Sequence, residues 1–545
     1  MLGLGSGINR LSAAEAAAIA VRIPGFTGLL DESYGASAEA AYSVRKLTNR
    51  VSVAMTIRRD SDSTEADIGF DSNGNLDEGA ITAFCTGTTC RVASWKDQSG
   101  NDNHAVQAVA SNQPTIYTGG ALVKEQGRVA LQGTSTSKLP LSSTVALSNE
   151  ASIFTLCTTK ATANPWGGDS SGTGQLTWIY FANVNTNWRL ITNSGTAYYD
   201  VPFTVEGTRL LQTHNRNSSN SVPLTLNGTL ANTQSLSGDI PVKVVMGGNW
   251  FNYAGIGQEM IFYNSEKSAS DQTSIEENVG DYFTQNTPLL DTYTGAAAAY
   301  SLRKLSSSYS GPAIRVRRDN DNLETDINFN VFGELDTVSL VAHCGSNNGY
   351  VANWYDQSSN SNTARQTTAA SQPKIYDSVT GVATDGNKPC LELNPSQQVG
   401  TSLTLNNDPI FVACVGSATI DKKGLVGLGG ADAYRRFSIE AWPGYNRGFA
   451  QWIGNGSTYA SAVQSGVNAN QSVIISHKLS DDTKMYRNGS LIHTLTDNLD
   501  SSGVLGFGYR EAVGTGKISE AVIYTSDQTT NRTNIESNIT TFYGI

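Results

Sequence analysis

Charged side chains are scarce in this chain. Lysine, arginine, aspartate and glutamate together make up 16% of its 545 residues, a low share for a cytosolic enzyme of this size. Hydrophobic runs are short as well, because none reaches the roughly 18–20 residues that a helix needs to span a bilayer. The apolar stretch at residues 11–22 contains a charge in its middle, which is untypical of a signal peptide. We therefore expect neither long solvated helices, nor a membrane span, nor a cleaved leader.

Cysteine and histidine are few too. The six cysteines contain at most one plausible pair, which argues against a secreted disulfide framework and fits assembly in a reducing cytoplasm. The five histidines lack the spacing of zinc ligands, so no zinc site is predicted. The formal net charge of -11 disfavours nucleic-acid binding, because an acidic surface repels phosphates.

Small and polar residues take the place of charge. Glycine occurs 53 times, with a visible excess of serine, threonine and asparagine, a composition that suits short strands joined by tight turns. Hydrophobic residues at 39% suffice to build packed cores. Because 545 residues are too many for one ordinary core, we expect two or more domains.

The chain contains one pattern twice, at an offset of 257–261 residues. The matched positions include Leu29 and Leu289, Tyr42 and Tyr300, Arg58 and Arg317, Trp95 and Trp354, Asp97 and Asp356, Cys157 and Cys414, Glu259 and Glu520, and Ile275 and Ile535. A repeat of this length is too long for a solenoid unit. The sequence therefore predicts two copies of one domain, residues 29–286 and 287–545, preceded by an arm of residues 1–28.

Two local patterns predict helices in each copy. Residues 36–47 and 296–305 are rich in alanine and end in Arg-Lys-Leu, which predicts a short helix with cations near its C-terminus. Asp77 and Asp336 stand where N-cap residues would open a short apolar helix.

The remaining patterns predict strands. Residues 314–317 alternate with period two, as in a half-buried strand, and residues 410–415 form a continuous apolar run, as in a strand buried on both faces. The pairs Asn227-Gly228 and Asn488-Gly489 predict hairpin turns. Each copy is therefore interpreted as a β-sandwich that follows a small helical and turn-rich section.

Three motifs of the first copy carry a resemblance to a known family. They are Tyr42-Ser43-Val44-Arg45-Lys46-Leu47, Ala66-Asp67-Ile68-Gly69-Phe70 and Trp95-Lys96-Asp97-Gln98-Ser99-Gly100-Asn101. These motifs are similar to the catalytic domain of fungal α-L-arabinofuranosidases of the AbfB type, which is a concanavalin-like sandwich. The ends of both copies, residues 257–283 and 517–543, look like the closing strand and helix of laminin-G-like or concanavalin-like lectin modules.

The resemblance implies a mainly β fold, with two tandem concanavalin-like β-sandwich (jelly-roll) domains and short helices. It also implies that Cys85 and Cys90 close a small loop, although whether they are bonded is left open; Cys344 has Gly349 in place of a partner. Tandem sequences that open like residues 1–7 are, in addition, similar to virion proteins of tailed phages.

The family's hydrolysis needs two carboxylates about 5–5.5 Å apart, one a nucleophile and one an acid/base. By resemblance the acid falls at Gly247-Gly248-Asn249, where an amide stands, and the second copy reads Gly506-Phe507-Gly508-Tyr509-Arg510. The nucleophile falls near residues 188–193, which lack a glutamate, whereas the second copy offers Glu440. The family's disulfide between adjacent cysteines has no counterpart. We therefore predict a retained fold without catalysis.

Aromatic rings in surroundings rich in glycine and asparagine are candidates for stacking on sugars. The candidate glycan-binding residues are Trp188, Asn249, Trp250, Glu440, Trp442 and Trp452. For the tryptophans the alternative is a role in the core or in an interface. Trp95 and Trp354 match each other and are assigned to the core.

Two acidic clusters have spacings that a calcium loop uses. They comprise Asp60, Asp62 and Asp67 in the first copy and Asp319, Asp321 and Asp326 in the second. The alternative is an acidic turn neutralised by the neighbouring Arg58-Arg59 or Arg317-Arg318. Calcium is thus the one cofactor left open.

Two classes of function remain. The first is a non-enzymatic phage virion protein, such as a head decoration, a fibre or a tail-associated adhesin, whose lectin-like domains bind host or environmental glycans. In that case residues 1–28 dock onto other virion proteins, with the alternative that they fold back on the first domain, and the protein is present in many copies or as a homo-oligomer. The second class is a glycoside hydrolase related to α-L-arabinofuranosidases.

Overall fold

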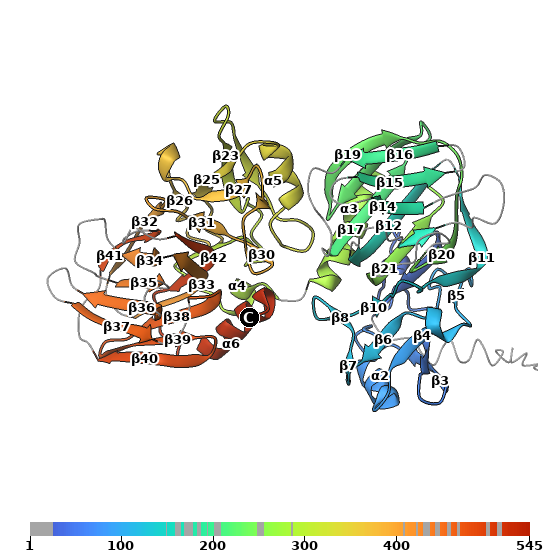
Figure 1. The fold of residues 1–545 in the computed structure, drawn as a ribbon, viewed down its shortest axis with the longest axis horizontal. Coiled ribbons are helices and arrows are strands. Elements are labelled where there is room, and N and C mark those ends of the chain that lie inside the picture. Colours follow the sequence, from blue (N-terminus) through green and yellow to red (C-terminus); the bar gives the residue numbers. More distant parts are fainter. Residues whose placement is uncertain are drawn as a thin grey trace, which may run out of the picture. The chain divides into compact units, whose positions relative to one another are not determined.

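The chain forms two compact units, Met1–Phe283 and Thr284–Ile545, and each is described by itself (Figure 1). The structure is a computed structural model that describes residues 26–148, 150–158, 165–167, 178–182, 187–192, 195–200, 209–247, 255–284, 287–406, 409–420, 423–428, 437–441, 447–454, 459–465, 469–496, 502–508 and 515–545. Among these residues, no helix is long and apolar enough to cross a bilayer.

The first unit consists mainly of strands. Its elements are η1 (Leu29–Asp31), β1 (Ala38–Ser43), β2 (Val53–Arg59), β3 (Glu65–Gly69), α2 (Glu78–Cys85), β4 (Cys90–Trp95), β5 (Ala105–Val106), η2 (Ala110–Asn112), β6 (Thr115–Thr118), β7 (Ala121–Leu122), β8 (Lys124–Glu125), β9 (Arg128–Val129), β10 (Leu131–Gln132), β11 (Leu139–Leu147), β12 (Ala151–Thr158), β13 (Trp166–Gly167), β14 (Trp178–Ala182), β15 (Asn187–Thr192), β16 (Gly195–Asp200), β17 (Arg209–Arg216), β18 (Ser221–Leu226), β19 (Thr229–Ser235), β20 (Ile240–Val245), β21 (Ile256–Tyr263) and α3 (Ala269–Phe283).

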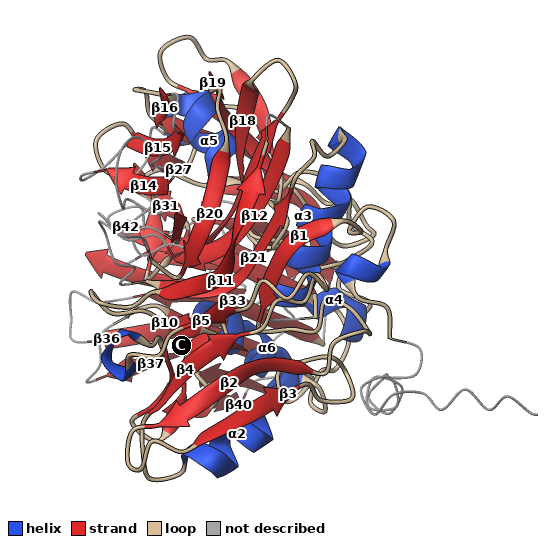
Figure 2. Ribbon diagram, turned by 90° about the vertical axis from the view of Figure 1, so that its right-hand side faces the viewer, coloured by secondary structure: helices blue, strands red, loops and turns tan. Residues whose placement is uncertain are grey.

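The second unit repeats this order. Strands predominate in the chain and helices are few (Figure 2). Its elements are α4 (Leu289–Thr292), β22 (Ala298–Ser301), β23 (Ile314–Arg318), β24 (Glu324–Ile327), α5 (Thr337–Cys344), β25 (Gly349–Trp354), β26 (Ala364–Arg365), η3 (Ala369–Ser371), β27 (Lys374–Asp377), β28 (Gly381–Val382), β29 (Thr384–Asp385), β30 (Lys388–Pro389), β31 (Leu391–Leu393), β32 (Val399–Asn406), β33 (Ile410–Ile420), β34 (Lys423–Leu428), β35 (Phe437–Ala441), β36 (Arg447–Gly454), β37 (Tyr459–Ser465), β38 (Ser472–Lys478), β39 (Asp482–Arg487), β40 (Ser490–Thr496), β41 (Ser502–Phe507), β42 (Thr515–Tyr524) and α6 (Arg532–Tyr543).

Each unit contains a sandwich of two antiparallel sheets. In the first unit, one sheet has the order β1-β21-β12-β17-β18-β19 and the other β5-β11-β20-β13-β14-β15-β16. In the second unit the orders are β22-β42-β33-β38-β39-β40 and β26-β32-β41-β34-β35-β36-β37. The mainly β sandwich fold predicted for both copies is confirmed, and the two copies share one pattern of strand pairing.

The closing helix of the second unit covers the outer face of its first sheet. Ile535, Ile539 and Tyr543 of α6 belong to one buried cluster with Phe411 and Ala413 of β33. Because strand residues alternate between faces, the neighbouring Val412 and Cys414 face the other sheet of the sandwich. The buried strand predicted at residues 410–415 is therefore confirmed, with both of its faces covered.

The helices predicted at residues 36–47 and 296–305 are wrong, because these segments contain the strands β1 and β22. Both strands pair with the closing strand of their sheet, β21 or β42. Nearly every residue of β1 is buried, so both of its faces are covered. Alanine favours helix only weakly, by less than 1 kcal/mol per residue, and burial in a sheet outweighs that preference.

The other local predictions are confirmed. Asp77 accepts a hydrogen bond from the N–H of Ala80 at 2.9 Å and caps α2, and Asp336 caps α5 in the same way. The turn residues Asn227 and Gly228 have φ values of 52° and 86°, and both therefore have the left-handed conformation of a two-residue hairpin turn. The second Asn-Gly pair joins β39 to β40 likewise.

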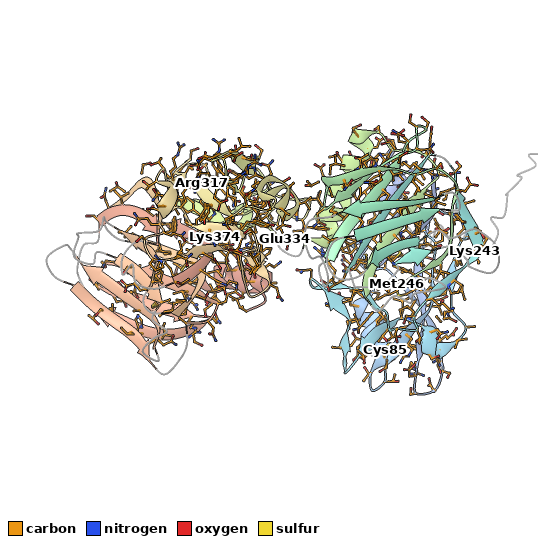
Figure 3. The ribbon with its side chains drawn as sticks, turned by 45° about the horizontal axis from the view of Figure 1, so that its top comes forward. Cys85, Lys243, Met246, Arg317, Glu334 and Lys374 are labelled. Carbon is orange, nitrogen blue, oxygen red and sulfur yellow. A yellow bond between two sulfur atoms is a disulfide. The ribbon has the colours of Figure 1, made fainter. Side chains whose placement is uncertain are left out.

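The cysteines differ between the units. Cys85 and Cys90 are joined by a disulfide (Figure 3 labels Cys85), whereas Cys344 is free and buried. A Cβ atom added to Gly349 would lie 2.6 Å from the sulfur of Cys344, so the glycine occupies the place of the missing partner. Cys157 and Cys414, which are matched positions of the repeat, are both buried in the central strands β12 and β33.

Candidate functional site

Glu440 lies in β35, on the face of its sheet that is turned away from the other sheet of the sandwich. Its neighbour Ile439 stands opposite Gln451, whose side-chain amide donates to the hydroxyl of Ser476 in the first sheet. Because consecutive strand residues point to opposite faces, Glu440 points outward. It is nonetheless buried, with 1% of its surface exposed, and the hydroxyl of Ser438 donates to its Oε1 at 3.0 Å. This is an oriented carboxylate on the outer face of the second sheet.

The corresponding strand position of the first unit is Tyr180. In the first unit Gly167 pairs with Trp178, two residues before Tyr180, and in the second unit Gly427 pairs with Ser438, two residues before Glu440. The stretch at residues 188–193, where the sequence comparison expected the nucleophile, instead begins in β15, the next strand of the sheet. Neither β14, which contains Tyr180, nor residues 188–193 include a glutamate. The first unit therefore has no counterpart of Glu440 in these strands.

Strand register also aligns the ends of β20 and β41. Val245 pairs with Leu139, the first residue of β11, and Phe507 pairs with Val399, the first residue of β32. Val245 and Phe507 are therefore equivalent positions.

This register changes the comparison at the place where the family has its acid. Asn249 lies four residues beyond Val245, and Glu511 lies four residues beyond Phe507. Glu511 directly follows the stretch Gly506-Phe507-Gly508-Tyr509-Arg510 at which the resemblance places the family's acid in the second copy. Asn249 and Glu511 both lie outside the described residues.

Each of the candidate sugar-stacking tryptophans lies either on the second sheet of its own unit or outside the described residues. Trp188 is in β15 of the first unit, and Trp452 is in β36 of the second, opposite Ser438 in the ladder next to Glu440. Trp250 and Trp442 lie outside the described residues. Trp95 and Trp354 are fully buried, as predicted for core residues.

The acidic clusters proposed for calcium contact arginines. Asp60 pairs with Arg91 at 2.9 Å, and Asp62 pairs with Arg59 at 2.5 Å. Backbone hydrogen bonding from Thr64, together with Arg59, holds the pKa of Asp62 below its ordinary value. The third acid of this cluster, Asp67, accepts a hydrogen bond from the hydroxyl of Thr56 at 2.6 Å.

The second cluster behaves in the same way. Arg318 lowers the pKa of Asp321 to about 2, and Arg315 lowers that of Asp326. Asp319 accepts hydrogen bonds from the backbone and side chain of Asn348. Among the described residues no group of three or more histidine, cysteine or acidic side chains could hold a metal ion. The arrangement thus favours an acidic turn neutralised by arginine.

Two buried ion pairs account for the matched glutamates of the closing strands. Arg45 donates to both carboxylate oxygens of Glu259, at 2.7 and 2.9 Å, and the hydroxyl of Ser43 donates to the same carboxylate at 2.6 Å. Arg303 and Glu520 repeat the arrangement at 2.7 and 2.8 Å. These carboxylates are fully bonded inside the fold, so they are structural groups.

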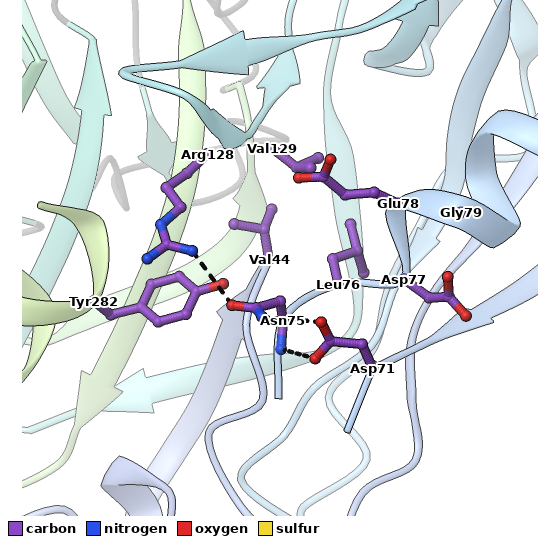
Figure 4. Close-up of a pocket in the computed structure, with 10 residues that line it drawn as sticks. All are labelled: Val44, Asp71, Asn75, Leu76, Asp77, Glu78, Gly79, Arg128, Val129 and Tyr282. Carbon is purple, nitrogen blue, oxygen red and sulfur yellow. Dashed lines mark hydrogen bonds between the residues drawn. The ribbon is translucent and has the colours of Figure 1, made fainter. Parts of the chain in front are cut away.

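A cavity of about 330 Å³ opens in the first unit (Figure 4). Its lining comes from the end of β1, the loop between β3 and α2, the β8–β9 hairpin and α3, and comprises Val44, Asp71, Asn75, Leu76, Asp77, Glu78, Gly79, Arg128, Val129 and Tyr282. Burial raises the pKa of Tyr282 to about 12, which keeps its hydroxyl protonated. Although burial acts in the opposite direction, hydrogen bonds from Asn75 and Asn73 hold the pKa of Asp71 below its ordinary value.

Sequence reasoning missed this cavity because three segments far apart in the chain build it. Asn75, Arg128 and Tyr282 form no motif. The signal that could have found them is the difference between the copies, since the matched residues of the second unit are Glu334, Lys388 and Phe542.

Comparison with known families identifies one match. The sequence profile described as "Alpha-L-arabinofuranosidase B, catalytic" matches residues 31–148 and 289–401, the first part of each unit and less than half of the chain. No curated protein sequence matches the chain. Both units therefore resemble the catalytic domain of α-L-arabinofuranosidase B, as the sequence motifs predicted.

Solved structures with similarity to the chain include carbohydrate-active proteins. A mutant of a GH54 α-L-arabinofuranosidase soaked with 4-nitrophenyl α-L-arabinofuranoside is 16% identical, with a TM-score of 0.38, over 47% of this chain and 64% of that chain. An arabinofuranosidase complexed with arabinofuranosyl-α-1,2-xylobiose is 14% identical, with a TM-score of 0.37, over 67% of this chain and 87% of that chain. A sialidase CBM40 from Ruminococcus gnavus, bound to α2,3-sialyllactose, is 13% identical, with a TM-score of 0.21, over 24% of this chain and 83% of that chain. The chain thus spans less than two thirds of the first of these proteins.

Proposed function

We propose that this protein is a non-enzymatic component of a phage virion whose two arabinofuranosidase-like sandwiches bind surface glycans. The observation that carries the proposal is the unequal second sheet, which has Glu440 in one unit and Tyr180 at the corresponding position of the other. Hydrolysis with retention needs two carboxylates, whereas sugar binding needs none. The first unit thus has the scaffold without the pair that the chemistry requires.

The extent of the family match supports this proposal. The matched residues end at 148 and 401, before the central strands β12 and β33 begin. Tyr180 and Glu440 both lie beyond the matched residues, in the part of each unit that has diverged from the family. Because one fold can host different functions, a sandwich that matches the family outside its reactive strands can serve binding in place of catalysis.

The location on a virion is supported by the sequence. Tandem copies and the opening residues 1–7 are similar to virion proteins of tailed phages, and the net charge of -11 disfavours a partner rich in phosphate. In this proposal the protein is a head decoration, a fibre or a tail-associated adhesin, assembled in the host cytoplasm. Residues 1–28, of which 1–25 lie outside the described residues, dock it onto other virion proteins.

The absence of catalysis is tested with an aryl arabinofuranoside. The full chain, incubated with 4-nitrophenyl α-L-arabinofuranoside, is expected to release nitrophenol no faster than buffer alone. The first unit lacks the second-sheet glutamate, and the strand of Glu440 in the second unit lies beyond the residues that match the family. Absorbance at the nitrophenolate band measures the release. Glu440→Gln serves as the matched control and is expected to behave identically. Turnover by the native chain that disappears in Glu440→Gln would overturn this part of the proposal.

The display on a particle is tested by deleting residues 1–28 from the chain in an infected cell. The truncated protein is expected to keep its melting temperature, because both sandwiches are intact, but to be missing from purified particles. Mass spectrometry of the particles measures its copy number against the full-length protein. Incorporation of the truncated protein at the normal copy number would show that residues 1–28 do not dock it.

A glycoside hydrolase confined to the second unit is the second candidate. It is favoured by the outward-facing carboxylate of Glu440, oriented by Ser438, and by a second glutamate, Glu511, at the chain position where the first copy has Asn249. Glu511→Gln distinguishes the candidates further, because a hydrolase would lose turnover in this variant as well as in Glu440→Gln.

A further inference from the structure

The cavity of the first unit has an apolar floor and a polar rim (Figure 4). Val44 and Leu76, which are almost fully buried, form the floor. On one side, the guanidinium of Arg128 stacks 4.4 Å from the centre of the Tyr282 ring and donates to Asn75 at 3.3 Å. An apolar floor can take the C–H face of a small polar molecule while the rim bonds its polar groups.

Much of the donor capacity of this rim is unused. A guanidinium has five N–H donors, and among the described residues Arg128 uses one of them in a long hydrogen bond. The hydroxyl of Tyr282 makes no hydrogen bond to any residue that the structure describes, and the high pKa of this group keeps it a donor. Across the cavity Glu78 offers a carboxylate, which also pairs with Lys124 at 2.8 Å. The rim therefore offers both donors and acceptors to a ligand.

The second unit shows that the fold does not require this open arrangement. Asn75 and Glu334 occupy equivalent places, because the backbone of each forms an isolated antiparallel β-bridge. The partner is the arginine of the buried ion pair, Arg45 for Asn75 and Arg303 for Glu334. In the second unit Lys388 reaches Glu334 at 2.5 Å (Figure 3 labels Glu334).

The remaining members of the stack are matched as well. Arg128 and Lys388 are both in short hairpins, β8–β9 and β29–β30. Lys388 lies 4.2 Å from the ring centre of Phe542, which has no hydroxyl. Both units thus place a cation on an aromatic ring. In the second unit the cation, Lys388, forms an ion pair with Glu334, whereas in the first unit Arg128 keeps unused donors among the described residues.

Charge and size restrict the ligand. The cavity is lined by three carboxylates, from Asp71, Asp77 and Glu78, and by one cation, Arg128, so an anionic ligand would be repelled. A volume of about 330 Å³ is at the lower end of the range for small-molecule sites. Vicinal hydroxyls match alternating donors and acceptors, and the C–H bonds of a sugar ring match the floor.

We propose that this cavity binds one neutral sugar residue of a saccharide, through Arg128, Tyr282, Asn75 and Glu78. The inference rests on the proposed function in taking a saccharide as the ligand, but it names a site in the first unit, whereas Glu440 is in the second. The two ideas can therefore fail separately.

The test measures binding of small glycosides to the full chain by saturation-transfer NMR and calorimetry. The probes are methyl α-L-arabinofuranoside and methyl β-D-galactopyranoside as neutral sugars, and D-glucuronate as the anionic one. We expect saturable binding of at least one neutral glycoside, including one site in the first unit, and weaker binding of glucuronate.

Two variants copy the second unit into the first. Asp71→Asn, Asn75→Glu and Arg128→Lys together introduce the residues of the closed arrangement, Asn330, Glu334 and Lys388, and should weaken binding at least about tenfold. Asp71→Asn is included because a carboxylate there would repel the new glutamate. Tyr282→Phe, which copies Phe542, removes only the hydroxyl and should weaken binding about three- to tenfold, so it decides the question if the triple variant does not fold.

Glu334→Gln, an exchange at the matched position of the second unit, is the control and should leave binding unchanged. Glu440→Gln should also leave it unchanged, which separates this site from the outer face of the second sheet. The proposal is overturned if no neutral glycoside binds, if glucuronate binds more tightly than both neutral probes, or if neither the triple variant nor Tyr282→Phe weakens binding.

Discussion

Replacing Arg303 by methionine is expected to destabilise the second unit by about 3–5 kcal/mol. The arginine and its partner Glu520 are both buried, with 2% and 0% of their side chains exposed, and are joined by two hydrogen bonds. Among the residues that the structure describes, the variant leaves the carboxylate of Glu520 inside the fold with only the hydroxyls of Ser301 and Tyr543 as donors. An uncompensated buried charge is costly because water can no longer solvate it. Urea unfolding followed by tryptophan fluorescence measures the loss.

Two further variants show whether charge burial is the cause. Arg303→Met combined with Glu520→Leu removes both charges and should recover at least about half of the lost stability. Arg318→Ala removes a cation from a pair that is partly exposed, 27% and 43%, and should change stability by less than about 1 kcal/mol. If Arg303→Met and Arg318→Ala lower the free energy of unfolding by the same amount, burial of the charge pair is not the cause of the loss.

Replacing Trp166 by valine is expected to destabilise the first unit by about 3–5 kcal/mol. The indole is fully buried, packs edge-on against Phe262 at 5.6 Å between ring centres, and donates to the hydroxyl of Thr155. The smaller side chain leaves a cavity that the surrounding strands cannot close, because sandwich cores are packed as densely as crystals. Chemical denaturation of the full chain, resolved by unit where two transitions are seen, measures the effect.

The second unit supplies the rescue for this variant. Trp166 stands opposite Val245, while in the second unit Val426 stands opposite Phe507, so the large and small members of one cross-strand pair are exchanged. Adding Val245→Phe to Trp166→Val should restore more than half of the loss, because residues opposite each other share one face of the sheet. A double variant no more stable than Trp166→Val alone would contradict the equivalence of these strands.

Much of the fold was predictable because its signals are local or repeated. Helix N-caps at Asp77 and Asp336 and the Asn-Gly hairpins depend on residues next to each other in the chain. The duplication was visible because matched residues recur at a nearly constant offset. The alanine-rich segments were predicted wrongly, since their strands exist only through pairing with β21 and β42, more than two hundred residues away.

The candidate site was less predictable. Glu440 was identified from its sequence context, but its counterpart Tyr180 emerged only from the pairing of β13 with β14, because the middle of the repeat has diverged. The match of Val245 with Phe507, a few residues before Asn249 and Glu511, likewise emerged only from strand register. Sequence alignment cannot match residues reliably where loops change length, whereas the register of hydrogen-bonded strands still defines which residues correspond.

The amino-acid sequence by itself determined the number of domains, their mainly β character, the family they resemble and the ends of several elements, because composition, repetition and turn chemistry are properties of neighbouring residues. Tertiary structure alone decided that β1 and β22 are strands, that four of the six acids considered for calcium pair with arginines, and that Asn75, Arg128 and Tyr282 line one cavity. The physical reason is that burial and charge pairing are set by contacts between distant segments, which no local pattern records.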